Sequence, residues 1–191
     1  MSATSISLLE DLRRQPNETA WHRLVDLYTP LIRVWLARHS VRNQDIEDLV
    51  QEVLAVVVRK VPEFERNPRT GSFRRWLRTI TVNCLRDFWR TRRWSPRAGH
   101  AAPLLDQLED SDSPLSKLWA QEHHEHVIRR LLTMIRPRFQ ATTWLAFQRV
   151  VFDGVPVDQV AAELELTPNA VFIAKSRVIH VLREEGRGLI D

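Results

Sequence analysis

The chain has 191 residues, of which 43% are hydrophobic and 27% charged, so it can bury a substantial core and is not disordered as a whole. Lys and Arg outnumber Asp and Glu by only 28 to 24, so the distribution of basic residues says more than the net charge of +4. The single cysteine, Cys84, excludes an intramolecular disulfide and indicates a reducing compartment.

The N-terminal part of the chain predicts a soluble, cytoplasmic protein with a helical core. Acids flank the short apolar part of the N-terminus, unlike a signal peptide, and no apolar run is long enough to span a bilayer. Asn17 is a suitable N-cap for a helix whose apolar positions run from Trp21 to Leu36. Pro30 lies inside this pattern and predicts a kink or a break.

The next predicted helix begins near residue 43, ends at Pro62 and has two different faces. We expect Asn43 or Asp45 to cap it, and its early acids suit the positive end of the helix dipole. One face is apolar. The other carries a stripe of residues at helical spacing: Asp48, Gln51, Glu52 and Ala55. Acids on such a face usually serve only to keep it solvated. Docking against a basic partner helix is the alternative role for Asp48 and Glu52.

After a loop marked by Pro62, Pro68 and Gly71, residues 71–94 predict one long helix. Its apolar stripe comprises Phe73, Trp76, Leu77, Ile80, Cys84 and Phe88, and Cys84 is best interpreted as a small buried residue. Between residues 72 and 93 there are seven arginines against a single acid, Asp87.

A second face of this helix carries residues suited to nucleic acid: Arg75, Thr79, Asn83, Arg86, Arg90 and Arg93. Arginine binds phosphate through a planar fork, and aromatic rings such as those of Trp76 and Trp89 can stack on unpaired bases. The helix therefore favours binding to a distorted or single-stranded nucleic acid, although Trp76 also lies on the apolar stripe. A solvated basic face is the alternative.

The following segment changes composition. Residues 95–114 combine Pro, Ala, Ser and acids without a sustained period, which predicts a flexible linker of about 20 residues. Its acids are Asp106, Glu109, Asp110 and Asp112. They serve either as solubilising charge or as mimics of nucleic acid in a basic channel.

Helical periodicity returns over residues 115–135 and includes the cluster Glu122, His123, His124, Glu125 and His126. Such residues bind metal when they share a helix face, as Glu122 and His126 can. No further ligand motif completes a closed site, so we expect a solvated helix face and neither a metal nor a cofactor.

The last third predicts a helix ending near Gly154, then a helix, a tight turn and a second helix. Thr167 is the expected N-cap of that second helix, with Pro168 at its first position. Ala161 and Ala162 allow the close crossing that a helix-turn-helix requires. The buried side of the last helix should comprise Val171, Ala174, Val178, Val181 and Leu182. The expected DNA-facing residues are Asn169, Phe172, Ile173, Lys175, Ser176, Arg177 and His180. A plain helical hairpin is the alternative.

Three stretches together resemble bacterial RNA polymerase sigma factors of the sigma-70 family, extracytoplasmic-function (ECF) group. They are DIEDLVQEV, GSFRRWLRTITVNCLRDFWRTRR and ELELTPNAVFIAKSRVIHVLREE, in the order and spacing of that family. The resemblance implies an all-α fold of two small helical domains joined by a flexible linker. Residues 1–94 would be sigma region two, 95–114 the linker, and 115–191 the region four helix-turn-helix.

The resemblance also implies a role in transcription initiation, without catalysis or catalytic residues. The expected partners are core RNA polymerase, through its β′ and β subunits, and promoter DNA, with an anti-sigma factor as a further candidate. Asp48, Gln51 and Glu52 would dock on a coiled coil of β′. The minus-ten element would be bound by Arg75, Thr79, Asn83, Arg86, Trp89, Arg90 and Arg93. The minus-thirty-five element would be bound by Thr167, Asn169, Phe172, Lys175, Ser176 and Arg177.

Further details of the resemblance concern the loops and the recognition helix. The loop from Glu63 to Ser72 would capture a flipped base, and the linker would pass through the polymerase toward its active-site cleft. Many relatives have Gly at the position of Asn169 and a basic residue at that of Phe172. Phenylalanine can touch a thymine methyl group but cannot pair with guanine, so the minus-thirty-five preference is left open.

Three other functions are weighed against this interpretation. A conventional helix-turn-helix regulator would leave the arginine-rich helix and the acidic stripe unexplained. A nucleic-acid enzyme would need clustered carboxylates, and Asp48 with Glu52 is the nearest pair. A helical adaptor that binds only protein predicts no role for Arg86 or Arg90.

Overall fold

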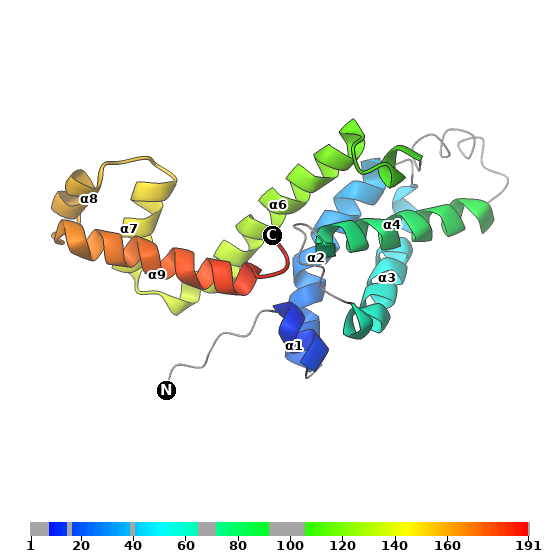
Figure 1. Ribbon diagram of the computed structural model, residues 1–191, viewed down its shortest axis with the longest axis horizontal. Helices are drawn as coiled ribbons and strands as arrows, with labels where there is room; N and C mark the ends of the chain where they lie inside the picture. Colours follow the sequence, from blue (N-terminus) through cyan, green and yellow to red (C-terminus); the bar gives the residue numbers. More distant parts are fainter. Residues whose placement is uncertain (1–7, 15–16, 39–40, 65–71, 92–105, 191) are drawn as a thin grey trace. The chain divides into compact units, whose positions relative to one another are not determined.

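The computed structural model describes residues 8–14, 17–38, 41–64, 72–91 and 106–190 (Figure 1). The regular elements of this part of the chain are all helical, which confirms the predicted all-α fold. The described residues up to Val127, together with those from Arg187 onward, form one compact unit, and Ile128–Gly186 form a second. We call them the N-terminal unit and the C-terminal unit.

The N-terminal unit is built on three long helices. They are α2 (Glu18–Arg38), α3 (Asn43–Lys60) and α4 (Ser72–Thr91); α3 packs against both of the others. The short helices α1 (Leu8–Arg14) and η1 (Val61–Glu63) lie against each other at one end (Figure 1). Fully buried aromatic side chains, including Tyr28, Trp35 and Phe73, fill the core between the long helices.

The first long helix begins as predicted. The Asn17 side chain caps α2, because its Oδ1 accepts a hydrogen bond of 2.8 Å from the backbone N–H of Ala20. Pro30 does not split the helix, which continues to Arg38. Leu27, Leu31 and Trp35 are buried on either side of the proline, and their packing keeps the two halves of the helix together.

The predicted cap of α3 is wrong. Arg42 is the N-cap residue, and it caps through its backbone: its carbonyl accepts a 2.8 Å hydrogen bond from the N–H of Asp45. Asn43 and Asp45 therefore lie inside the first turn, where Asp45 is buried. The acid still lies at the positive end of the helix dipole, as the sequence indicated.

The end of the predicted linker is ordered. Residues 92–105 lie outside the described part of the chain, but 106–109 form a helical turn with Leu108 buried. Ser113 then caps helix α6 (Pro114–Ile135), since its Oγ accepts a 3.0 Å hydrogen bond from the N–H of Ser116. The helix therefore begins with a typical signal, Ser113 at the N-cap and Pro114 at the first position. This signal was missed in the sequence because the composition of the whole segment indicated a linker.

The first half of α6 packs in the N-terminal unit, although the prediction assigned residues from 115 onward to the second domain. The Trp119 ring meets the Trp35 ring edge-on, with ring centroids 4.3 Å apart. His123 lies against Tyr28 in the same core, with ring centroids 5.7 Å apart. Helical periodicity identified the helix and could not show which unit its apolar face would join.

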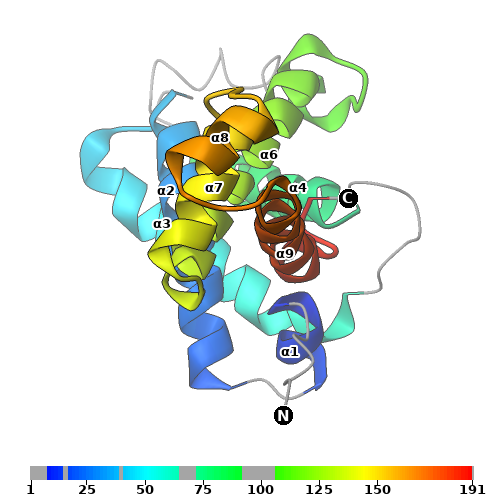
Figure 2. The same cartoon turned by 90° about the vertical axis from the view of Figure 1, so that its left-hand side faces the viewer.

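The C-terminal unit comprises the end of α6 and four further helices. They are η3 (Arg136–Arg138), α7 (Ala141–Val151), α8 (Val157–Glu163) and α9 (Pro168–Gly186), and both α7 and α8 pack on α9 (Figure 2). The core contains Ala146, Val160, Val171 and Ala174, with a second cluster around Phe147 and Val178. Val181 and Leu182 pack against this second cluster, so the predicted buried side of α9 is confirmed.

The turn between α8 and α9 depends on an unusual backbone conformation. Glu165 has φ of +54°, the left-handed region that side chains other than glycine rarely adopt. Its N–H donates to the carbonyl of Ala162 and the next N–H, of Leu166, donates to that of Ala161, which is a Schellman motif. Ala161 is buried in the core, whereas Ala162 is exposed, so only Ala161 serves the close packing predicted for the pair.

Candidate nucleic-acid interface

One side of α4 forms a continuous exposed polar face. Arg75, Thr79, Asn83 and Arg90 are exposed along it and Arg86 is half-buried, while Phe73, Leu77, Ile80 and Cys84 are buried on the other side. Val82 and Leu85 widen the buried surface. The two stripes expected from the sequence are therefore separated in the structure. Arg93, also predicted for this face, lies outside the described residues.

The two tryptophans of α4 differ in their surroundings. Trp76 is half-buried among aromatic rings, with centroids 5.0 Å from that of Phe64 and 5.3 Å from that of Phe73. These contacts favour the core role for Trp76. Trp89 is half-buried near the end of the helix, where part of its ring remains at the surface.

Arg86 lies at the centre of a polar network that the sequence did not predict. It donates a 3.2 Å hydrogen bond to Oδ1 of Asn83 and forms an ion pair with Glu109, in the helical turn before α6. Arg90 pairs with Asp87 one turn away, with 2.9 Å between Nη2 and Oδ1. Two arginines predicted to contact DNA thus have carboxylate partners within the N-terminal unit.

The acidic stripe of α3 is exposed along its length. Asp48, Gln51, Glu52 and Ala55 all face solvent on one side of the helix. The neighbouring Glu47 has a different role, because Arg33 of α2 donates two hydrogen bonds to its carboxylate, at 2.6 and 2.8 Å. These bonds lower the pKa of Glu47 and raise that of Arg33. The stripe is therefore distinct from the acid that joins α2 to α3.

The N-cap of α9 is as predicted. Thr167 caps α9, with its Oγ1 accepting a 3.1 Å hydrogen bond from the N–H of Ala170, and Pro168 takes the first position. Asn169, Ser176 and Arg177 are exposed, and Lys175 is half-buried. Phe172 and Ile173 are 52% and 43% exposed, so an apolar patch occupies the middle of the expected DNA-facing side. A shallow hollow of about 350 Å³ lies between this patch, Arg177 and His180.

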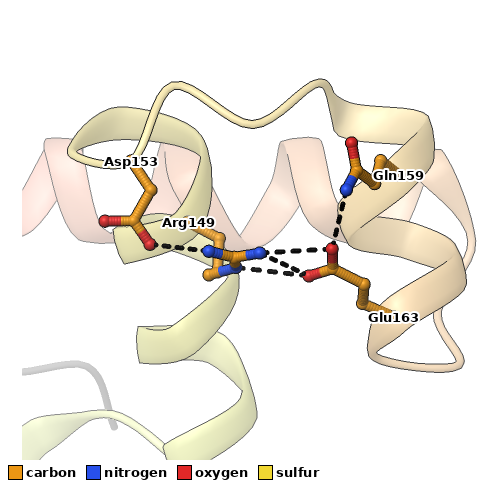
Figure 3. A network of polar contacts seen from close by, with 4 residues as sticks. All are labelled: Arg149, Asp153, Gln159 and Glu163. Carbon is orange, nitrogen blue, oxygen red and sulfur yellow. Dashed lines mark hydrogen bonds and ion pairs between the residues drawn. The ribbon is translucent and has the colours of Figure 1, made fainter.

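An ion-pair network holds α7 against α8 (Figure 3). Arg149 of α7 donates hydrogen bonds of 2.9 to 3.2 Å to both carboxylate oxygens of Glu163, and one of 3.0 Å to Asp153. Gln159 donates a further 3.0 Å bond to Glu163. Hydrogen bonds from Arg149 and then Gln159 lower the pKa of Glu163, and those to Glu163 and then Asp153 raise the pKa of Arg149.

The histidine cluster of α6 is structural. His123 is buried and its Nε2 lies 3.3 Å from the Tyr28 hydroxyl, while His126 Nε2 lies 2.7 Å from the Leu27 carbonyl oxygen. Glu122 forms an ion pair with Arg38. The predicted solvated face is thus wrong for these three residues and holds for the exposed His124 and Glu125. Within the described ranges, no three His, Cys, Asp or Glu residues are grouped to hold a metal ion.

Comparison with protein families identifies residues 24–95 as matching sigma-70 region 2. The match spans most of α2, all of α3 and α4, and hence both the acidic stripe and the polar face of α4. None of the curated proteins compared with the chain matches it. No helix in the described parts of the chain is long and apolar enough to cross a membrane.

The match supports a sigma factor of the sigma-70 family, with a role in promoter recognition and transcription initiation. Proteins of this family are initiation factors and not enzymes, and they bind core RNA polymerase and promoter DNA.

Proposed function

We propose that the chain is a cytoplasmic sigma factor of the ECF group that binds core RNA polymerase and directs transcription from specific promoters. One observation carries the proposal: the segment matching sigma-70 region 2 exposes an arginine-rich polar face on α4, and the same chain has two helices, α8 and α9, joined by a short turn with a capped second helix, as a helix-turn-helix would. A conventional regulator needs only the second feature. The pairing of the two favours a factor that contacts a promoter at two elements.

The acidic stripe of α3 is the proposed docking surface for the polymerase. Asp48, Gln51 and Glu52 are exposed at helical spacing, and they would face a basic coiled coil of β′. Glu47 is held by Arg33 and is not part of this surface. The contact is charged and exposed, so it should weaken as the salt concentration rises.

The polar face of α4 is the proposed minus-ten interface. Arg75, Arg86 and Arg90 would contact phosphates, and Asn83 with Trp89 would contact unstacked bases of one strand. Opening a duplex costs about 1–2 kcal/mol per base-pair step. Contacts with the separated strand can offset this over a few steps, which explains why opening would begin at a short element.

The exposed side of α9 is the proposed minus-thirty-five interface. Thr167, Asn169, Lys175, Ser176 and Arg177 would contact phosphates and base edges. Phe172 would add apolar contact, and the exposed ring suits a thymine methyl group better than guanine. We further propose that the linker passes the basic cleft of the polymerase, although one of its acids, Glu109, is paired with Arg86 in the free chain. An anti-sigma factor is the proposed regulator.

The decisive experiment is run-off transcription with the purified chain, core RNA polymerase and a library of promoter fragments. We expect discrete starts that appear only when the chain is present and that vanish in the variant Arg86→Ala with Arg90→Ala. The matched control is Arg129→Ala with Arg136→Ala, which removes two exposed arginines outside the predicted surfaces. The absence of starts, with no comigration of chain and core enzyme, would replace this proposal with the conventional regulator.

Docking on the polymerase has its own test. Asp48→Lys with Glu52→Lys should abolish comigration with the core enzyme, because the charge of the stripe is reversed. Glu125→Lys, a charge reversal at an exposed acid of α6, should leave comigration unchanged. Equal binding by both variants would exclude the α3 stripe as the docking surface.

A further inference from the structure

The N-terminal unit contains a basic cavity beside the polar face of α4. It has a volume of about 150 Å³ and lies between the first turns of α4, the turn before α6 and the start of α6. Its polar and charged lining includes Arg74, Arg75, Arg78, Ser111, Lys117 and Trp119. Of these residues, only Arg75 was predicted to bind nucleic acid. The spacing of Arg74 and Arg78 along the sequence does not indicate that α6 packs beside them.

Four of the lining residues carry a positive charge. Among the described residues, none of the side chains of Arg74, Arg78 and Lys117 forms a hydrogen bond or an ion pair with another residue. Arg78 is only 8% exposed, and Asp110 is the one acid that acts on its pKa. Burial, followed by repulsion from neighbouring arginines, lowers the pKa of both Arg74 and Arg78. The cavity thus concentrates positive charge that the described residues offset only in part, through Asp110 near Arg78.

Trp119 supplies a second, independent indication of a ligand. The residue is 1% exposed, it lines the cavity, and its Nε1 has no hydrogen-bond partner in the part of the chain that the structure describes. Its ring is fixed by edge-on packing against Trp35. An indole N–H is only a donor, so a buried one of this kind is satisfied by an acceptor such as an anionic oxygen.

We propose that this cavity binds a phosphate group, with Arg74, Arg78 and Lys117 pairing with the oxyanion. The Trp119 indole forms one wall of the same cavity. The start of α6 contributes the positive end of its dipole to the same space. The volume is that of a few water molecules, at about 30 Å³ each, which is enough for a phosphate or diphosphate group.

The phosphate can come from two sources. It can be free phosphate or diphosphate in solution, or a backbone phosphate of a nucleic-acid strand lying along α4, because Arg75 belongs to both the cavity and the polar face. The recognition chemistry is the same in both cases. Competition between the two ligands separates them.

The test is titration of the full chain with sodium pyrophosphate at constant ionic strength, without polymerase. Heat of binding is followed by calorimetry, and the indole N–H of Trp119 by ¹H–¹⁵N spectra, with Trp119→Phe identifying its signal. We expect saturable binding that shifts this signal. Lys117→Gln and Arg78→Gln should each weaken binding at least tenfold, whereas Arg59→Gln, at an exposed site on α3, should change it less than twofold.

Lys117 is exposed, so its replacement keeps the test valid even if Arg78→Gln perturbs the core. Unchanged affinity in Lys117→Gln, or a Trp119 signal that does not move, would overturn the proposal. A single-stranded oligonucleotide supplies the second arm. If pyrophosphate displaces the oligonucleotide, and Lys117→Gln weakens the binding of both pyrophosphate and the oligonucleotide, the natural ligand is a strand phosphate. If pyrophosphate binds without displacing the oligonucleotide, the natural ligand is free phosphate. This readout does not depend on transcription, so it is separate from the test of the proposed function.

Discussion

The hydroxyl oxygen of Tyr28 lies 3.3 Å from Nε2 of His123, which joins the middle of α2 to the first half of α6. Both side chains are buried. Burial lowers the pKa of His123 to about 3, helped by the nearby charge of Arg74, and it raises the pKa of Tyr28 well above its usual value. The pair is therefore neutral at pH 7, and the docking of α6 in the N-terminal unit depends on an uncharged imidazole.

Acid should destabilise the N-terminal unit through His123. The folded pKa lies below the unfolded value of 6.5, so the unfolded chain binds the extra proton and stability falls as the pH drops from about 6.5 toward 3. This single residue should remove about 2 kcal/mol between pH 7 and pH 5. Urea unfolding at the two pH values measures the loss, and His123→Gln should reduce it. An equal loss in that variant would assign the pH dependence to other groups.

The turn before α9 should become more stable with glycine at position 165. Glu165 has φ of +54°, which costs an L-residue about 1–2 kcal/mol and costs glycine little. Allowing for the greater freedom of glycine in the unfolded chain, Glu165→Gly should stabilise the C-terminal unit by about 0.5–1 kcal/mol. Thermal unfolding measures the change. Glu165→Ala, which keeps the Cβ atom, is the control and should give no gain.

Gly154 offers the reverse substitution in the same unit. Its φ is +67° and a Cβ atom there would meet nothing within 4 Å, so Gly154→Ala adds backbone strain without a steric clash. We expect a loss of about 1 kcal/mol in the same thermal measurement. A neutral result would mean that this loop relaxes to another conformation at little cost.

The helices were predictable because their apolar residues repeat at helical spacing and their ends carry local signals. Asn17, Thr167 and Pro168 act within a few residues of themselves, so the sequence alone identifies them. The two faces of α4 follow from the same periodicity. The predicted cap of α3 was wrong because Arg42 caps the helix through its backbone carbonyl, and a backbone contact has no side-chain pattern in the sequence.

Contacts between distant segments could not be predicted in this way. The ion pair of Arg86 with Glu109, the core position of His123 and the cavity beside Arg78 all depend on where the first half of α6 packs. Periodicity shows that a helix has an apolar face and not what that face covers. From the sequence alone, Glu109 in the linker and His123 in its polar run are therefore expected to be solvated. Their partners, Arg86 and Tyr28, lie more than 20 residues away along the chain.

Cys84 should be unreactive in the folded chain. Burial, with smaller contributions from Glu52 and Asp87, raises its thiol pKa from 9.0 to about 11. Near pH 8 the thiolate fraction is then about 100-fold smaller than in the unfolded protein, and access is also blocked. Reaction with a chromogenic disulfide should be at least this much slower without urea than with it. A fast reaction in the native state would show that α4 opens readily from the core.

The ion pair between Glu109 and Arg86 should oppose binding of the minus-ten strand. Arg86 pairs with Glu109 and also bonds to Asn83, so both proposed DNA contacts are engaged in the free chain. The pair is half-exposed, and such pairs contribute about 0.2–1 kcal/mol. Glu109→Gln should therefore tighten binding of a labelled single-stranded promoter oligonucleotide to the chain–polymerase complex by about two- to fivefold at low salt, and less at high salt.

Asp106→Asn, at an exposed acid of the same turn without this contact, is the control and should have a smaller effect. Weaker binding in Glu109→Gln would mean that Glu109 positions Arg86 for DNA instead of competing with it.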